Sequence, residues 1–256
     1  MKEGRSNSSH PLFWLLSVVC LLVVWTGLAW YIQSRALPSP LQVAAAIATE
    51  TRSGELIVHM WATLSRVVAA FIVAMAIGTA IGVLLGKNPA LDKFFDPWVI
   101  LFLNLPALVI IVLSYIWFGL TEAAAIGAVA LNKIPNVIVT IREGAKSLEP
   151  QFAEMAQVFR FSKWQTLRHV VLPQLQPYIA AATRSGIALI WKIVLVVELL
   201  GRSNGVGFQI NLYFQLFDVA TILAYTLVFV AVMLAVEYLI LQPLERHSRR
   251  WRVNHA

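Results

Sequence analysis

The sequence predicts an all-α integral membrane protein with six transmembrane helices. Apolar residues of the AVILMFWYC set make up 59% of the 256 residues, and charged residues make up 13%, about half of their share in soluble domains. The mean hydropathy is +0.74, and the apolar residues gather in runs long enough to cross a bilayer, which takes about 20 residues. The single cysteine, Cys20, lies in such a run, which excludes a disulfide scaffold.

Six apolar runs are the candidate spans. None of them alternates between apolar and polar residues, as the shorter strands of a membrane β-barrel would. The third run contains an interior proline, Pro106. We expect helices at residues 11–32, 67–85, 97–120, 122–141, 174–200 and 219–241.

The first run follows Lys2 and Arg5, as the apolar part of a signal peptide would. Its apolar stretch is about 22 residues long, whereas a cleaved signal peptide has about 7–15. We therefore interpret it as an uncleaved first helix. The whole chain, residues 1–256, is then one polytopic membrane domain.

Lysine and arginine residues between the runs predict the orientation, because these residues accumulate in cytoplasmic loops. With the N-terminus inside, the inner segments hold 13 of them and the outer segments hold 3, namely Arg35, Arg52 and Arg202. We therefore expect both termini in the cytoplasm. The same distribution accounts for the net charge of +7. The basic tail at residues 246–252 is interpreted as an anchor to anionic membrane lipid, and no nucleic-acid partner is expected.

Three glycines, Gly78, Gly82 and Gly86, recur every four residues in the second predicted helix. They share one face, and small residues at this spacing let another helix approach closely. That helix belongs either to the same chain or to a second subunit. We favour packing within the chain, because such patterns are common there.

The inner loop at residues 142–173 is the most informative segment. Pro150 suits the first turn of a helix, and Ser162 with Gln165 fits a capping box that starts a second one. Between them runs an apolar stripe at helical spacing: Phe152, Met155, Ala156 and Phe159. Such a helix lies on the membrane surface, packs on the chain's own helices, or docks into a groove of another protein. Periodicity leaves all three open.

The loop resembles the EAA loop of ABC-importer permeases. That pattern is E-A-A, three residues, G, nine residues and I-x-L-P. Met155 and Val170 are conservative replacements, whereas Arg160 stands at the glycine position. Because glycine permits a left-handed turn, Arg160 must adopt that turn at a cost or use a different one. Four positions match the pattern: Glu154, Ala156, Leu172 and Pro173.

Other segments are similar, in the same order, to the nitrate, sulfonate and taurine group of these permeases. The resemblance covers about residues 37–241. It implies the type I ABC-importer permease fold, with a permease core at residues 57–242, a cytoplasmic coupling helix and a location in the bacterial inner membrane. The similar segments are LPSPLQV at 37–43, SRV at 65–67, FDPW at 95–98, WFG at 117–119 and VELLG at 197–201.

The resemblance also implies partners. A second permease copy, two cytoplasmic ATP-binding subunits and an extracytoplasmic solute-binding protein would complete the importer. ATP and Mg²⁺ would bind to the ATPase, no cofactor or metal would bind to this chain, and the solute would be a small anion such as a sulfonate, taurine or nitrate. The coupling contacts would come from eight loop residues: Phe152, Glu154, Met155, Ala156, Phe159, Arg160, Leu172 and Pro173.

Catalytic motifs do not support an enzyme. Residues 82–87 read GVLLGK, one residue short of a P-loop. The five histidines, among them His59, fall in predicted loops, edges or tails, and we expect them to be solvated. Glu198 and Glu237 lie on different predicted helices and make a poor catalytic pair for an intramembrane enzyme. The alternative is a secondary transporter driven by an ion gradient, although its typical internal repeat is not evident.

Three cations fall within predicted spans: Lys133, Arg184 and Lys192. A cation at the bilayer centre costs at least about 2.5–3.5 kcal/mol, so we expect these side chains to face the bundle interior or a hydrated path. One hypothesis pairs them with helix-end carbonyls or acidic side chains. The other has at least one of them, Lys133 or Lys192 first, attract a small anion in the translocation path.

Overall fold

The computed structural model describes residues 10–243, and every regular element in this range is a helix. The predicted all-α membrane architecture is confirmed. Five helices are long and apolar enough to cross a membrane, and a bent pair, α4 and α5, adds a sixth crossing if counted as one span. The basic tail at residues 246–252 lies outside the described range. The elements are α1 His10–Ile32, α2 Pro40–Ser53, α3 Glu55–Lys87, α4 Pro89–Asn104, α5 Ala107–Phe118, α6 Glu122–Lys146, α7 Pro150–Val158, α8 Lys163–Thr166, η1 Leu167–Val171, α9 Leu172–Gly201, α10 Val206–Gln215, α11 Val219–Val236 and η2 Glu237–Leu241.

The prediction of one continuous helix at residues 97–120 is wrong. Two helices, α4 and α5, meet there at an angle of 95°. Pro106 is the N-cap of α5, and Leu105 before it is extended, with φ −68° and ψ 125°. A proline has no N–H to donate and disfavours the helical conformation of the preceding residue. These two effects end α4 at Asn104 and turn the chain.

The second long helix extends further than the predicted range 67–85. Gly54 adopts a left-handed conformation, with φ 84°, and closes α2. The chain then enters α3 directly at Glu55. The segment between the first two predicted spans is therefore largely helical, and His59 and Arg66 lie inside α3.

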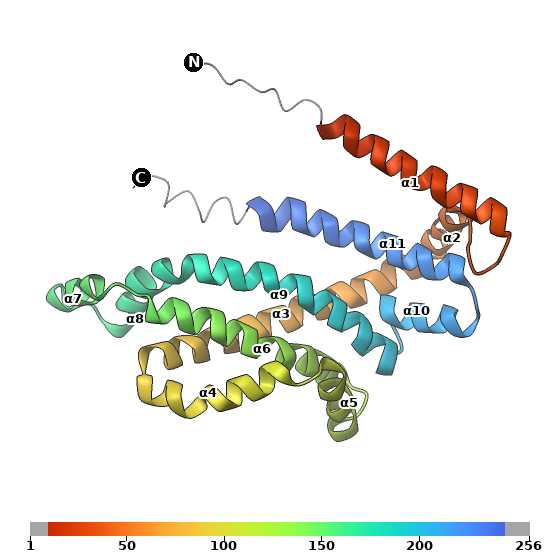
Figure 1. Ribbon diagram of the computed structural model, residues 1–256. Helices are drawn as coiled ribbons and strands as arrows, with labels where there is room; N and C mark the ends of the chain where they lie inside the picture. The colour runs from red at the N-terminus through yellow and green to blue at the C-terminus, as the bar shows by residue number, and fades with distance from the viewer. Residues whose placement is uncertain (1–9, 244–256) are drawn as a thin grey trace, which may run out of the picture.

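Helix α6 lies at the centre of the bundle, between α3 and α9 (Figure 1). The three glycines of α3 face α6, so the favoured prediction of packing within the chain is confirmed. A Cβ at Gly78 would lie 2.6 Å from Val137, one at Gly82 2.8 Å from Ile141, and one at Gly86 2.5 Å from Ala145. The two backbones are close enough that side chains at these glycines would collide with α6.

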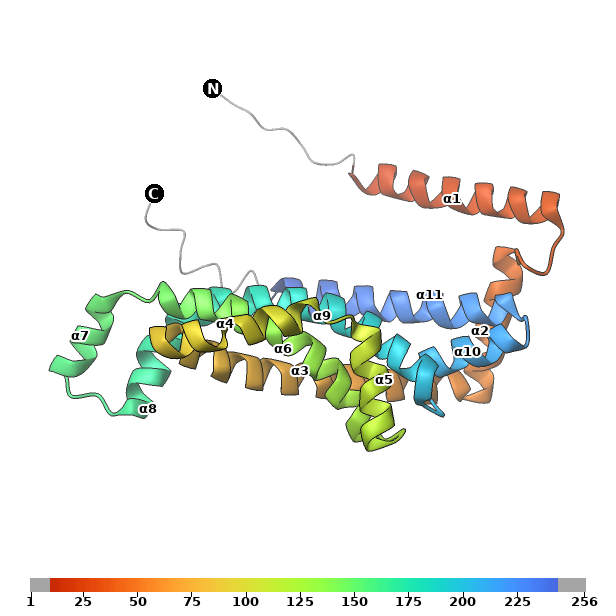
Figure 2. The ribbon, with the colours of Figure 1, turned by 60° about the horizontal axis from the view of Figure 1, so that its bottom comes forward.

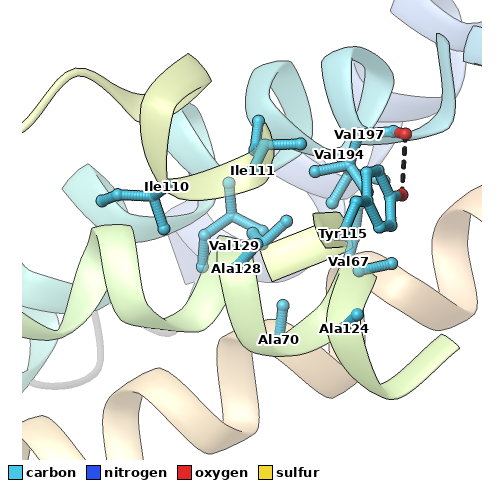
Figure 3. Close-up of a cluster of buried hydrophobic side chains, with 12 residues drawn as sticks. Val67, Ala70, Ile110, Ile111, Tyr115, Ala124, Ala128, Val129, Val194 and Val197 are labelled. Carbon is cyan, nitrogen blue, oxygen red and sulfur yellow. Dashed lines mark hydrogen bonds between the residues drawn. The ribbon is translucent and has the colours of Figure 1, made fainter. Parts of the chain in front are cut away.

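The largest buried apolar cluster joins four helices, α3, α5, α6 and α9 (Figure 3). Tyr115 of α5 closes one side of it, and its hydroxyl donates to the carbonyl of Val197 on α9 at 2.9 Å. This bond satisfies the polar end of a side chain that is otherwise packed among apolar groups. The cluster therefore anchors α5 to the bundle in spite of the sharp turn at Pro106.

Helices α2, α10 and α11 pack together at the opposite end from α7 and α8 (Figure 1). The Glu50 carboxylate of α2 accepts hydrogen bonds from the Tyr213 hydroxyl of α10 at 3.1 Å and the Tyr225 hydroxyl of α11 at 2.8 Å. Burial and the nearby Glu50 raise the pKa of Tyr213 to about 12. The phenol therefore stays protonated and keeps donating across the physiological range.

Helix α1 stands apart from this bundle (Figure 2). Only 6% of its apolar window is buried, and Ala29 is its one buried side chain among those described. A hydrogen bond from Trp25 Nε1 to the Pro38 carbonyl, at 3.0 Å, ties its end to the linker that follows. The start of α1 and the end of η2 both point toward the end of the molecule that carries α7 and α8 (Figure 1).

Candidate functional site

The segment from α7 to α8 projects from one end of the bundle (Figure 1). Pro150 occupies the first turn of α7, as predicted, and the Glu149 N–H before it donates to Gln174 Oε1 of α9 at 3.1 Å. The predicted capping box is also confirmed. The Ser162 hydroxyl accepts from the Gln165 N–H at 3.2 Å, and Gln165 Oε1 accepts from the Ser162 N–H at 2.8 Å. Both helices therefore begin where local chemistry places them.

Arg160 adopts the left-handed turn between the two helices, with φ 52°. Its N–H donates to the Gln157 carbonyl at 3.0 Å, and the Phe161 N–H donates to the Ala156 carbonyl at 2.9 Å. This pair of bonds is a Schellman motif, in which glycine is the usual left-handed residue. A residue with a Cβ pays roughly 1–2 kcal/mol for that conformation. The first of the two predicted alternatives is correct: the turn is kept, with arginine in it.

The predicted apolar stripe of α7 has two sides. Ala156 is 3% exposed and faces the rest of the chain, whereas Phe152, Met155 and Phe159 are 42%, 41% and 68% exposed. Val158, Phe161 and Trp164 extend this exposed surface. We call these six apolar side chains the loop surface: Phe152, Met155, Val158, Phe159, Phe161 and Trp164.

A pocket of about 560 Å³ separates α7 from the ends of α6 and α9. Phe152 and Met155 line its outer wall, and Gln174 and Tyr178 line its inner wall. Leu172 and Pro173 lie at the start of α9 with their side chains exposed. Exposed Glu154 is on the same short helix. The eight residues predicted for coupling thus belong to one projecting end, although α7 itself stands away from the bundle.

Ion pairs link α4 and α6 at the end of the bundle that carries α7 and α8. Arg142 of α6 contacts Asp96 at 2.6 Å and Asp92 at 3.0 Å, both on α4. Lys146, one turn further along α6, contacts Asp92 at 2.8 Å. These bonds link α4 to the last turns of α6, so the loop that follows α6 starts from a fixed point.

Lys133 is the one of the three predicted span cations that lies inside the bundle. It is 2% exposed, and its Nζ lies 3.3 Å from the Ser185 hydroxyl of α9. No ion pair with Lys133 is found within residues 10–243. A buried cation without a carboxylate is unusual, because burial removes its hydration without replacing it.

Arg184 and Lys192 lie on the exposed face of α9 instead. Arg184 Nε is 3.9 Å from Glu237 Oε1 of η2, as one predicted pairing had it. Lys192 Nζ lies 5.5 Å from the centre of the Trp191 ring. Of the two predicted locations, the bundle interior therefore holds within this chain for Lys133 alone, and a hydrated path stays a prediction for Arg184 and Lys192.

A buried ionic cluster at the other end of the bundle was not predicted. Arg66 of α3 is 4% exposed and Glu198 of α9 is fully buried, and Arg66 Nη1 donates to Glu198 Oε1 at 2.6 Å. Arg66 also donates two hydrogen bonds to the Glu122 carboxylate at the start of α6, from Nε at 2.8 Å and from Nη2 at 2.6 Å. Its remaining contacts are the carbonyl and side-chain oxygens of Asn204. We call these four residues the Arg66 cluster.

The second oxygen of Glu198 is also satisfied. It accepts from the Thr63 hydroxyl and from the Gly207 N–H, each at 2.9 Å. Gly205, with φ 111°, passes so close that a Cβ there would overlap the Glu198 carboxylate. The chain between α9 and α10 is thus wrapped around this carboxylate, and glycine is required for the close approach.

His59 lies beside the Arg66 cluster, and the expectation that it is solvated is wrong. The side chain is 6% exposed, and its Nδ1 accepts the Gly205 N–H at 3.0 Å. Nε2 then carries the hydrogen and faces Glu55 Oε2 at 3.1 Å. Because α3 begins at Glu55, His59 lies within the bundle. Its position near a predicted loop therefore did not indicate exposure to solvent.

Comparison with known proteins places these features in a family. The family model for "Binding-protein-dependent transport system inner membrane component" matches residues 78–252. The putative aliphatic sulfonates transport permease SsuC of Bacillus subtilis is 26% identical over 98% of this chain and 91% of its own. The taurine permease TauC of Escherichia coli is 29% identical over 76% and 74%. The bicarbonate permease CmpB of Synechococcus elongatus is 27% identical over 82% and 80%.

Solved structures share the fold. An inward-facing form of the MetNI methionine ABC transporter superposes with a TM-score of 0.66, at 17% identity, over 78% of this chain and 99% of the other. An amino acid ABC transporter superposes with a TM-score of 0.62, at 18% identity, over 78% and 97%. The family model covers more than half of the chain, and the relatives match through most of their length. The chain therefore belongs to the binding-protein-dependent transport system inner membrane components and is a permease subunit of an ABC importer.

Proposed function

We propose that this permease couples solute passage to a cytoplasmic ATPase through the α7–α8 segment. The observation that carries the proposal is the loop surface, whose six exposed apolar side chains belong to a segment that projects from one end of the bundle (Figure 1). Exposed apolar patches of this kind mark protein contacts. The segment fits a helix-in-groove contact, because a short helix presents Phe152, Met155 and Phe159 outward while Ala156 holds it to the chain.

The remaining parts of the importer follow from this docking. The end with α7 and α8 is cytoplasmic, which puts both termini inside, in accord with the 13-to-3 distribution of Lys and Arg. Two ATPase subunits bind ATP and Mg²⁺, and two copies of this chain form a homodimeric pore. A binding protein delivers the solute at the end that carries the Arg66 cluster. Family membership favours this ATP-driven importer over an ion-gradient transporter.

The solute is proposed to be a small anion. Relatives of this chain are named for aliphatic sulfonates, taurine and bicarbonate. The exposed face of α9 carries two cations, Arg184 and Lys192. A helix face with two cations is disfavoured against lipid, so this face lines a hydrated path or a subunit contact in the assembly.

A charge reversal and an introduced charge on α7 test the docking. Glu154→Lys, on the exposed side, and Ala156→Asp, on the side that faces the chain, should each abolish uptake of taurine or ethanesulfonate while the permease still inserts. Co-purification with the ATPase should weaken, or ATP hydrolysis should no longer respond to the loaded binding protein. The matched control is Glu143→Lys, which makes the same reversal at the exposed end of α6.

Normal uptake and normal ATPase binding in both α7 variants would contradict the proposal. Loss of insertion in both would be separated from uncoupling by the amount of permease in the membrane. Loss of uptake in the Glu143→Lys control to the same extent would show that any reversal at this end is harmful and would remove the argument for α7.

A further inference from the structure

We propose that Lys133 and Ser185 form an anion-binding subsite on the translocation path. The inference rests on the proposed function, because it names residues for the solute that the importer moves. Lys133 is a nine-tenths-buried cation whose contact within the described residues is a hydroxyl, not a carboxylate. A structural lysine in a membrane bundle pairs with an acid or with backbone carbonyls, and the contact that the described residues give Lys133 is neither. A lysine that meets a transient anion needs no such partner.

The Lys133 side chain extends from α6 toward α9. Gly186 allows the passage, because a Cβ at this position would lie 3.2 Å from Lys133 Cε. The side chain thus runs past the backbone of α9 and ends at Ser185, whose side chain is exposed. The buried cation therefore lies one hydrogen bond from the exposed face of α9.

That face is already cationic. Arg184 precedes Ser185, and Lys192 follows it by seven residues, about two helical turns. Ala188 and Leu189 between them are exposed as well. The face therefore presents two cationic side chains with small or apolar side chains between them, and Arg184 of the two contacts Glu237. Lys133 adds a positive charge from behind, so the stretch from Ser185 to Lys192 favours anions over cations.

The donors suit a small oxyanion. The Lys133 ammonium has three hydrogens, and Ser185 Oγ, which now donates to the Ala182 carbonyl at 3.2 Å, has a hydrogen that rotation can redirect. Together they can bind two oxygens of one sulfonate or bicarbonate. A carboxylate in this position would occupy the lysine permanently, and the structure has none there among residues 10–243. The substrate class assigned to the site is thus a singly charged oxyanion.

A cysteine at Ser185 probes the site without knowledge of the solute. The native Cys20 is first changed to serine, because it is the one cysteine of the chain. The assembled importer is then treated with two methanethiosulfonates of similar size, the anionic ethylsulfonate and the cationic ethyltrimethylammonium. The ratio of their reaction rates reports local charge, and it is independent of how much of the thiol is ionised, because the same thiolate attacks both reagents and displaces methanesulfinate from each.

Lys133→Met in this background should lower the anion-to-cation ratio roughly tenfold, since one unit charge about 6 Å from the charged group of the reagent changes each rate about threefold in opposite directions in a water-filled path. Lys133→Arg should preserve the ratio. A cysteine at Leu199, also exposed on α9 and about 21 Å further along the helix, should be insensitive to Lys133→Met. If the methionine variant does not assemble, the ratio at Ser185→Cys must still exceed that at Leu199→Cys in the lysine-containing protein.

Two results would overturn the subsite: no reaction of Ser185→Cys with either reagent, which would place it against lipid or protein, or a ratio unaffected by Lys133→Met. Failure of the proposed function is seen separately. ATP hydrolysis stimulated by the loaded binding protein in the Cys20→Ser background would uphold the importer even where the thiol measurement removes the subsite.

Discussion

Replacing Arg66 by methionine should destabilise the folded permease by about 3–5 kcal/mol, the usual result of removing one partner of a buried ion pair. Methionine fills most of the volume of the arginine stem but leaves the Glu198 carboxylate, which has no exposed surface, without its cation. Thr63 and Gly207 still bond one carboxylate oxygen, so the loss should fall toward the lower half of this range.

The same structure predicts that a second substitution restores much of the loss. In Arg66→Met with Glu198→Gln, the buried charge is gone and the amide oxygen can still accept from Thr63 and Gly207. The double variant should therefore regain at least about 1.5 kcal/mol relative to additivity. Unfolding is followed by circular dichroism as sodium dodecyl sulfate is titrated into dodecyl maltoside micelles. Arg52→Gln, a change at an exposed arginine, is the control and should stay within about 0.5 kcal/mol of the parent.

An Arg66→Met variant as stable as the Arg52→Gln control would contradict the role given to this ion pair. Additive effects of the two substitutions at Arg66 and Glu198 would contradict it as well, because a direct charge pair 2.6 Å apart must show coupling. A loss confined to transport, with an unchanged unfolding curve, would mean that the Arg66 cluster contributes nothing to the stability of this end of the bundle.

Two more outcomes can be checked directly. In a chain with Cys20 changed to serine, a cysteine at Arg52 should react with an impermeant thiol reagent added to intact cells, whereas one at Lys146 should react only after lysis; the reverse would overturn the orientation. Gly86→Val should lower stability by roughly 1–3 kcal/mol through overpacking, whereas Gly27→Val, in α1, meets nothing within 4 Å and should leave the melting temperature unchanged. Equal effects of the two glycine changes would contradict the close contact between α3 and α6.

Apolar run length predicted the long helices because lipid requires continuous apolar helices. It failed where a local backbone effect interrupts such a run. The turn at Leu105 and Pro106 lies within an uncharged stretch, so hydropathy could not detect it, although the proline itself was a signal. The loop at residues 142–173 was predicted in more detail, because Pro150 and the Ser162–Gln165 capping box act on backbone groups only a few residues away in the sequence.

The Arg66 cluster could not be predicted in the same way. Its contacts join residues 56 to 138 positions apart, and no short-range pattern encodes such pairings. Arg66 looked like a polar residue at the edge of a span, because the two glutamates that bind it come from other helices. His59 pairs with Glu55 of its own helix, and its distant partner is the Gly205 N–H. In the sequence of a membrane protein, a charged residue at the edge of a predicted span should first be considered as the ion-pair partner of an acidic residue on a distant helix, and only then as a solvent-exposed residue.

The isolation of α1 has a consequence for how the protein melts. The backbone groups along its length are satisfied within the helix, as in any membrane-spanning helix, and breaking these bonds in lipid would leave polar groups without partners. Because it shares so few side-chain contacts with the bundle, α1 adds little to the cooperativity of the rest. Heating would therefore separate the packed helices from one another while α1 stays helical, and the unfolding transition belongs to the chain that follows it, from α2 to α11.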